Sequence, residues 1–283
     1  MNTNIFYLFL SVFLSSGRNI FSKKNAVSNK DISQFFFSQA SLFLSASLLL
    51  IPLCLINFSG ISKITFMYGI VYGILLVLSQ WMFTLSLKKG STSICSVIYS
   101  LGFLLPTLSG IVFWNEEFAF CDLIGLLIAI VIILLSMKKE SNQNRTITPL
   151  IIVAMLSSGG LGIMQKLQQK NPFAEQKNEF LTIAFLFAFL CSFLAFFNSK
   201  HKIKIEIKSA AYPLLTGLCF GGANLFNTIL AGKMKSAIFF PLQNISTIIF
   251  SSILGILIFK EKITLKTIFI IILGAATIIF FSI

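Results

Sequence analysis

The chain has 283 residues and a formal net charge of +13, yet 56% of its residues are hydrophobic, only 11% are charged, and 32 are phenylalanine. A soluble domain could not bury that much apolar surface, so the composition excludes soluble enzymes and indicates a helical membrane protein. Most basic residues stand in short connections between apolar segments, as membrane topology requires, so the positive charge does not indicate nucleic-acid binding.

Ten apolar segments of about membrane-spanning length follow one another along the chain. The first is too long for a signal-peptide core and has no small-residue cleavage pattern, so we interpret it as a retained helix. No connection is long enough for a soluble domain. The longest central connection, 139–148, separates five spans in residues 1–138 from five in 149–283. The expected spans are about 4–22, 33–56, 66–87, 92–114, 119–137, 149–167, 180–198, 210–232, 236–259 and 265–282.

A pattern in the fourth and fifth spans recurs in the ninth and tenth. A shift of 145 residues (261 − 116 = 145) superposes three pairs of identical residues: Ser91 on Ser236, Gly110 on Gly255, and Glu116 on Glu261. The run Leu14-Ser15-Ser16-Gly17 also recurs 142 residues later, from Leu156 to Gly159. A five-helix unit starts and ends on opposite sides of the membrane, so its second copy is inverted. The sequence therefore predicts an all-α membrane protein of ten transmembrane helices in two inverted five-helix repeats, an arrangement typical of secondary transporters.

These features resemble the drug/metabolite transporter (DMT) superfamily, and within it the ten-helix EamA-like transporters. The matching pattern is Gly110, Glu116 and then Gly125, repeated as Gly255 and Glu261; the second half departs from it, with Ile270 at the last glycine position and Gly274 four residues beyond. The resemblance implies a carrier of small polar metabolites, with a central cavity between helices one to four and six to nine. It also implies that helices five and ten are peripheral, where a homodimer contact would form.

No catalytic or metal-binding constellation is apparent in the sequence. The acidic residues stand in connections or at span ends, the cysteines are scattered singly through apolar segments, and the lone His201 lies in a lysine-rich connection. A proton relay through a carboxylate inside the membrane is therefore not favoured, and no cofactor or metal is expected. We expect Glu116 to cap the N-terminus of the helix that follows it, where a carboxylate is favourable.

Arg18 is the one charged residue placed well inside a predicted span, and two interpretations are open. Its side chain could snorkel to the surface near Lys23, about 7.5 Å further along the helix. Alternatively it faces a cavity, since it shares one helical face with Ser11, Ser15 and Ser22. A cavity-facing arginine favours an anionic or zwitterionic substrate, whereas a snorkelling one leaves an aromatic lining suited to a neutral or cationic substrate.

Further polar and aromatic residues lie near the middle of other spans. Amides are costly in lipid, so they should face inward, where they either line a cavity or hydrogen-bond helix to helix. We predict a substrate site near the membrane centre formed by Arg18 and by Gln80, Trp81, Tyr99, Asn224, Asn227, Gln243 and Asn244.

The sequence thus predicts a secondary transporter of the cell inner membrane that moves a small polar metabolite by alternating access. Two alternatives remain: a flippase-like protein for lipids or amphiphiles, which would need a polar groove open to lipid, and a membrane interaction protein without transport activity.

The orientation in the membrane follows from the distribution of charge. The excess of basic residues on one side of the membrane puts both termini outside by the positive-inside rule. The resemblance instead implies cytoplasmic termini.

Overall fold

The computed structural model describes residues 2–28, 31–89, 98–117, 119–136, 147–199, 207–259, 268–269 and 272–273. Within these ranges the regular structure is entirely helical, without a strand, and each of the first nine expected spans overlaps a helical segment, although residues 92–97 of the fourth span lie outside the described residues. The tenth expected span and the connection 139–148 lie largely outside the described residues. The elements are α1 (Asn2–Ser28), α2 (Ile32–Ile56), α3 (Lys63–Lys89), η1 (Leu101–Phe103), α5 (Leu104–Trp114), α6 (Phe120–Ser136), α7 (Ile147–Lys170), η2 (Ala174–Gln176), α8 (Lys177–Asn198), α9 (Ile207–Lys233) and α10 (Ser236–Phe259).

Six of these helices contain a segment long and apolar enough to cross a membrane: Thr3–Ser22, Ile32–Ile56, Lys63–Ser86, Pro149–Lys170, Ala174–Asn198 and Ala211–Lys233. Three further apolar helices within the described ranges are shorter: Ile98–Trp114, Phe120–Val131 and Ser236–Ser251. The protein is therefore a multi-pass membrane protein, because apolar helices of about 20 residues match the thickness of a bilayer core.

The first helix shows how the side chains sort between lipid and protein. Ser11 and Ser16 of α1 are fully buried, whereas Phe6, Phe9 and Phe13 are 50–57% exposed. On a helix of a soluble protein, the serines would face water and the phenylalanines would face the core. In a bilayer, however, hydroxyls need partners inside the protein, and aromatic rings can face hydrocarbon without cost. The polar face expected for this helix therefore points into the bundle.

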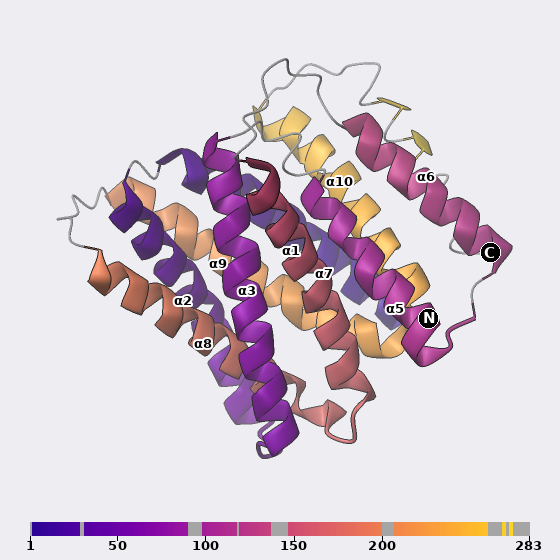
Figure 1. The fold of residues 1–283 in the computed structure, drawn as a ribbon, viewed down its shortest axis with the longest axis horizontal. Helices are drawn as coiled ribbons and strands as arrows, with labels where there is room; N and C mark the ends of the chain where they lie inside the picture. The colour runs from indigo at the N-terminus through magenta and orange to yellow at the C-terminus, as the bar shows by residue number, and fades with distance from the viewer. Residues whose placement is uncertain are drawn as a thin grey trace.

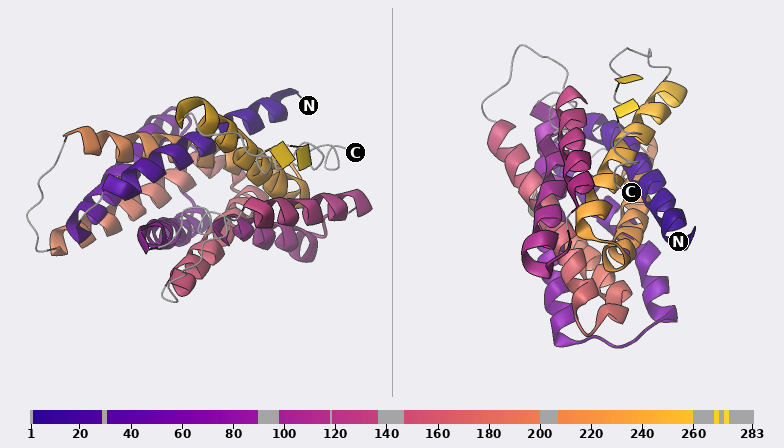
Figure 2. Two further views of the ribbon diagram at one scale, coloured as in Figure 1. Left: turned by 90° about the horizontal axis from the view of Figure 1, so that it is seen from above. Right: turned by 90° about the vertical axis from the view of Figure 1, so that its right-hand side faces the viewer.

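The helices form a bundle that is broader than it is deep (Figure 1, Figure 2). Helix α1 packs beside α9, α2 beside α8, and α3 beside α7, so the first part of the chain is interleaved with the second. Small residues permit this close packing: a Cβ added at Gly217 of α9 would lie 2.0 Å from the backbone oxygen of Leu42 in α2. Helix α6 lies at the edge of the bundle against α10 (Figure 1), in agreement with the peripheral fifth helix that the resemblance implies.

Two apolar clusters hold the bundle together. The first joins α2, α3, α7, α8 and α9 around Phe43, Tyr72 and Phe185. The second joins η1, α6, α9 and α10 around Phe103 and Phe239. Between the two clusters lies a partly polar cavity, lined by residues of both.

Candidate functional site

A cavity of about 160 Å³ lies among α1, the end of α3, the segment of η1 and α5, α7, α9 and α10. Both parts of the chain contribute to its wall. The described residues that line it include no aspartate or glutamate, and Arg18 is their only charged side chain. Six of the eight predicted site residues are on this wall: Arg18, Tyr99, Asn224, Asn227, Gln243 and Asn244.

Arg18 faces the cavity and does not snorkel. Its Nη2 donates to the amide oxygen of Gln80 at 2.8 Å and lies 3.4 Å from the hydroxyl of Tyr99. Its Cζ lies 4.1 Å from the ring centre of Phe220 in α9, which is cation–π geometry. The guanidinium is thus held between α3, the start of the fourth span and α9, and the first of the two sequence interpretations is wrong.

Gln80 and Trp81 are neighbours on α3 but point to different sides of it. Gln80 is 1% exposed and, although not on the cavity wall, holds Arg18 in place. Trp81 contradicts the prediction. Its ring packs edge-on against Phe36 of α2, with centroids 5.0 Å apart, and its Nε1 donates to Ser192 of α8 at 3.3 Å. Trp81 therefore links helices away from the cavity, because a step of one residue turns the side chain by about 100° around the helix.

Asn224 belongs to a buried network that includes residues not singled out in the sequence. Its Oδ1 accepts from the hydroxyl of Tyr72 at 2.5 Å and from Nε2 of Gln165 at 3.2 Å. Its Nδ2 donates to the carbonyl of Phe220, one turn earlier in α9. Gln165 also lines the cavity. Gln165 could have been identified from the sequence in the same way as Gln80, because it is a glutamine within a predicted span.

The remaining amides are bound to α1 or to their own helix. Asn227 accepts a hydrogen bond from Ser11, and Gln243 donates to Ser15 at 3.1 Å. Asn244 donates to the backbone carbonyl of Phe240 at 3.0 Å. The amides of Asn227 and Gln243 thus both line the cavity and join helices, so the two roles left open by the sequence coexist in the same side chains.

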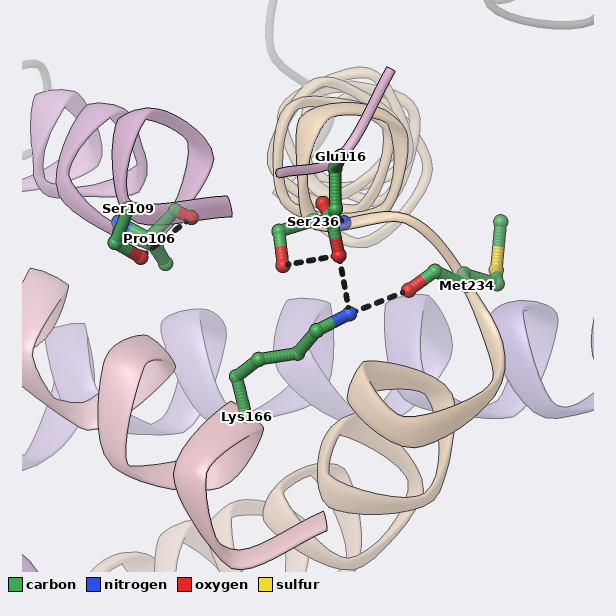
Figure 3. A network of polar contacts seen from close by, with 6 residues as sticks. All are labelled: Pro106, Ser109, Glu116, Lys166, Met234 and Ser236. Carbon is green, nitrogen blue, oxygen red and sulfur yellow. Dashed lines mark hydrogen bonds and ion pairs between the residues drawn. The ribbon is translucent and has the colours of Figure 1, made fainter. Parts of the chain in front are cut away.

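A second polar centre, which we call the latch, consists of Glu116, Lys166 and Ser236 (Figure 3). Nζ of Lys166 lies 2.6 Å from Oε1 of Glu116, with the two side chains only 2% and 9% exposed. The same Nζ donates to the carbonyl of Met234 at 3.0 Å, and Oε2 of Glu116 accepts from the backbone N–H of Ser236 at 2.5 Å. The latch therefore ties the end of α5 to α7 and to the first residue of α10.

This arrangement corrects the role expected for Glu116. The carboxylate does cap a helix N-terminus, where unpaired N–H groups favour an anion, but the helix is α10 rather than the following α6. It reaches α10 because Asn115 ends α5 in the left-handed region (φ 47°), with Glu116 N–H bonded to the carbonyl of Gly110. A Cβ on Gly110 would lie 2.5 Å from Oε2 of Glu116. The Gly110–Glu116 spacing thus leaves room for the capping carboxylate.

The latch lies one helical turn beyond the cavity on three helices at once. Pro106 of α5, Gly162 of α7 and Phe240 of α10 line the cavity. Gly162 and Phe240 stand four residues from Lys166 and Ser236, and Pro106 stands four residues from Gly110, which packs against Glu116. A Cβ on Gly162 would lie 2.7 Å from Pro106 and 2.9 Å from Phe240, so these three residues are in close contact. These three residues therefore form the end of the cavity nearest the latch.

No group of three or more metal-ligating side chains occurs in the described part of the chain.

Comparison with known proteins gives a family and a fold. A family model described as "Sugar transport protein" matches residues 14–283. The sequence comparison with curated proteins finds no match. Among solved structures, one described as "Crystal structure of protein" is similar at 12% sequence identity with a TM-score of 0.81, over 99% of this chain and 96% of that one. At that identity the likeness shows a shared fold and nothing about substrate.

Proposed function

The chain belongs to the sugar transport protein family, a family of membrane transporters, and we propose that it carries a small sugar or sugar-like polar metabolite across the cell inner membrane by alternating access. The observation that carries the proposal is the cavity between the two apolar clusters, whose wall holds an arginine, a tyrosine and several amides inside an otherwise apolar bundle. Polar groups are costly at membrane depth, and they commonly mark a substrate pathway.

The finer proposal is that the fold is the ten-helix inverted repeat of the EamA-like DMT transporters. The helix contacts support it, because exchanging the five spans of each half maps neighbouring pairs onto neighbouring pairs. The contact of α1 with α9 becomes that of α7 with α3, α2 with α9 becomes α8 with α3, and α1 with α10 becomes α7 with α5. A fold with two equivalent halves would give such a contact pattern.

The latch residues add a sequence argument for the repeat. Under the two shifts found in the sequence, the counterparts of Glu116, Lys166 and Ser236 are residues of the same types: Glu261 (116 + 145), Lys24 (166 − 142) and Ser91 (236 − 145). Ser91 and Glu261 lie outside the described residues. The glutamate and serine pairs are among those that define the 145-residue shift, and the lysine pair adds a further position of identical type in favour of two copies of one unit.

Alternating access would require the cavity to open to each side of the membrane in turn. Here Pro106, Gly162 and Phe240 are in contact, and the buried ion pair of the latch holds their three helices together one turn further out. We therefore assign this conformation to a state closed at the α5, α7 and α10 end. Separation of α10 from α5 and α7, with rupture of the latch, would expose the cavity on that side.

Transport by purified protein in liposomes tests the proposal. Counterflow of a labelled monosaccharide should occur with the wild type and be abolished by Asn227→Ala, which removes a cavity amide. The matched control is Trp81→Phe, which keeps an aromatic ring against Phe36 but lies away from the cavity. Equal loss in both variants would make Asn227 a packing residue only. Movement of labelled lipid between leaflets without sugar counterflow would favour the flippase alternative.

A further inference from the structure

Arg18 makes no ion pair in the described part of the chain. Its partners there are the neutral oxygens of Gln80 and Tyr99 and the faces of aromatic rings. Its Nε is buried and has no hydrogen-bond partner among the described residues. A guanidinium removed from water is destabilised unless a counter-charge or a full set of hydrogen bonds compensates. The cation–π contact with Phe220 offers part of this compensation.

Among the described residues, the rest of the cavity wall carries no compensating negative charge. The described lining residues near Arg18 are hydroxyls, amides and aromatic rings, without a carboxylate. The positive charge therefore points into a space otherwise lined by neutral hydrogen-bonding groups. A ligand that brings its own negative charge would complete the site, because arginine pairs with carboxylate and phosphate through two parallel N–H donors.

From these contacts we infer that the cavity selects an anionic monosaccharide: a polyol whose hydroxyls meet the amides and whose carboxylate or phosphate meets Arg18. The inference rests on the proposed transport function and adds the substrate class. The volume of about 160 Å³ lies below the roughly 300–1,000 Å³ of pockets for drug-sized ligands, so the ligand is of monosaccharide size. Gln80 is the positioning residue, since its amide oxygen fixes the guanidinium at 2.8 Å.

Binding to the purified full-length protein tests the substrate class. Glucuronate, glucose 6-phosphate and glucose are compared by calorimetry or by ligand-dependent thermal stabilisation. We expect glucuronate or glucose 6-phosphate to bind at least about tenfold more tightly than glucose, and the stronger of the two identifies a carboxylate or a phosphate as the charged group. Equal or tighter binding of glucose would overturn the inference while leaving sugar transport intact. Failure of all three sugars to bind would contradict the proposed function as well.

Two variants identify Arg18 as the source of selectivity. Arg18→Gln should weaken binding of the preferred anion at least about tenfold, and by more than it weakens binding of glucose. Gln80→Glu retains the arginine and is nearly isosteric, but places a carboxylate where the amide now accepts its hydrogen bond. The internal ion pair should then compete with the ligand, so the anion preference should also fall. Lys235→Gln, which removes an exposed charge 46% accessible to solvent, is the matched control and should change nothing. Anion preference unaltered in Gln80→Glu would refute the assignment even if Arg18→Gln failed to fold.

Discussion

The latch makes a quantitative prediction about stability. Glu116→Ala leaves the ammonium of Lys166, which is 2% exposed, with the carbonyl of Met234 as a neutral partner. It also removes the acceptor for the N–H of Ser236. Breaking a buried ion pair from one side typically costs about 3–5 kcal/mol. A lost helix cap alone costs about 0.5–2 kcal/mol, and the two losses overlap because one carboxylate makes both contacts.

The neighbouring residue supplies a matched control. Glu117 is 92% exposed and contacts Lys235 at 3.3 Å in solvent, so Glu117→Ala should change the free energy of unfolding by less than about 0.5 kcal/mol. Unfolding of both variants is followed in the same detergent by heating. Since about 1 kcal/mol shifts Tm by roughly 2–4 °C in chains of this order of size, Glu116→Ala should melt at least roughly 6 °C below the wild type.

A double variant separates charge from shape. In Glu116→Gln with Lys166→Met, neither buried charge remains and the amide oxygen can still accept from Ser236, so much of the lost stability should return. The reasoning is refuted if Glu116→Ala melts within about 2 °C of Glu117→Ala. It is equally refuted if the double variant is no more stable than Glu116→Ala.

Three further outcomes follow from the packing and the topology. Gly162→Ala should destabilise the protein by about 1–3 kcal/mol relative to Gly160→Ala in a thermal melt. Both variants gain the same helix propensity, but the new Cβ at 162 would meet Pro106 and Phe240, whereas one at 160 would lie 3.2 Å from the flexible side chain of Leu75. Trp81→Phe should lower Tm by a few degrees through loss of the hydrogen bond to Ser192, and it should leave the Kd for sugar unchanged. A changed Kd would indicate that Trp81 contributes to the binding site after all. A cysteine placed at Asn2 in a cysteine-free background should react with a membrane-impermeant maleimide in intact cells, as the excess of basic residues predicts, and protection there would favour cytoplasmic termini.

The span positions were predictable because hydropathy over about 20 residues is a strong, local signal. The polar face of α1 was visible too, since its serines and Arg18 repeat at spacings of three and four, but the sequence left open whether Arg18 faces a cavity or snorkels. For α3 the same reasoning fails. Gln80 and Trp81 are adjacent in sequence, and nothing local decides which of them turns toward Arg18 and which toward α2 and α8. That choice is made by the partners, Arg18 from α1 and Phe36 from α2.

The latch escaped prediction for a different reason. Lys166 stood one residue before the expected end of the sixth span at residue 167, and there a lysine usually marks the membrane surface. The helix instead continues to Lys170, and Glu116 and Ser236 approach Lys166 from 50 and 70 residues away in sequence. In the sequence, only the Gly110–Glu116 spacing was related to this contact, because the glycine leaves room for the carboxylate of Glu116. A glycine paired with an acid at a helix end can therefore mark the point where a third helix begins, which is a tertiary contact that hydropathy alone does not record.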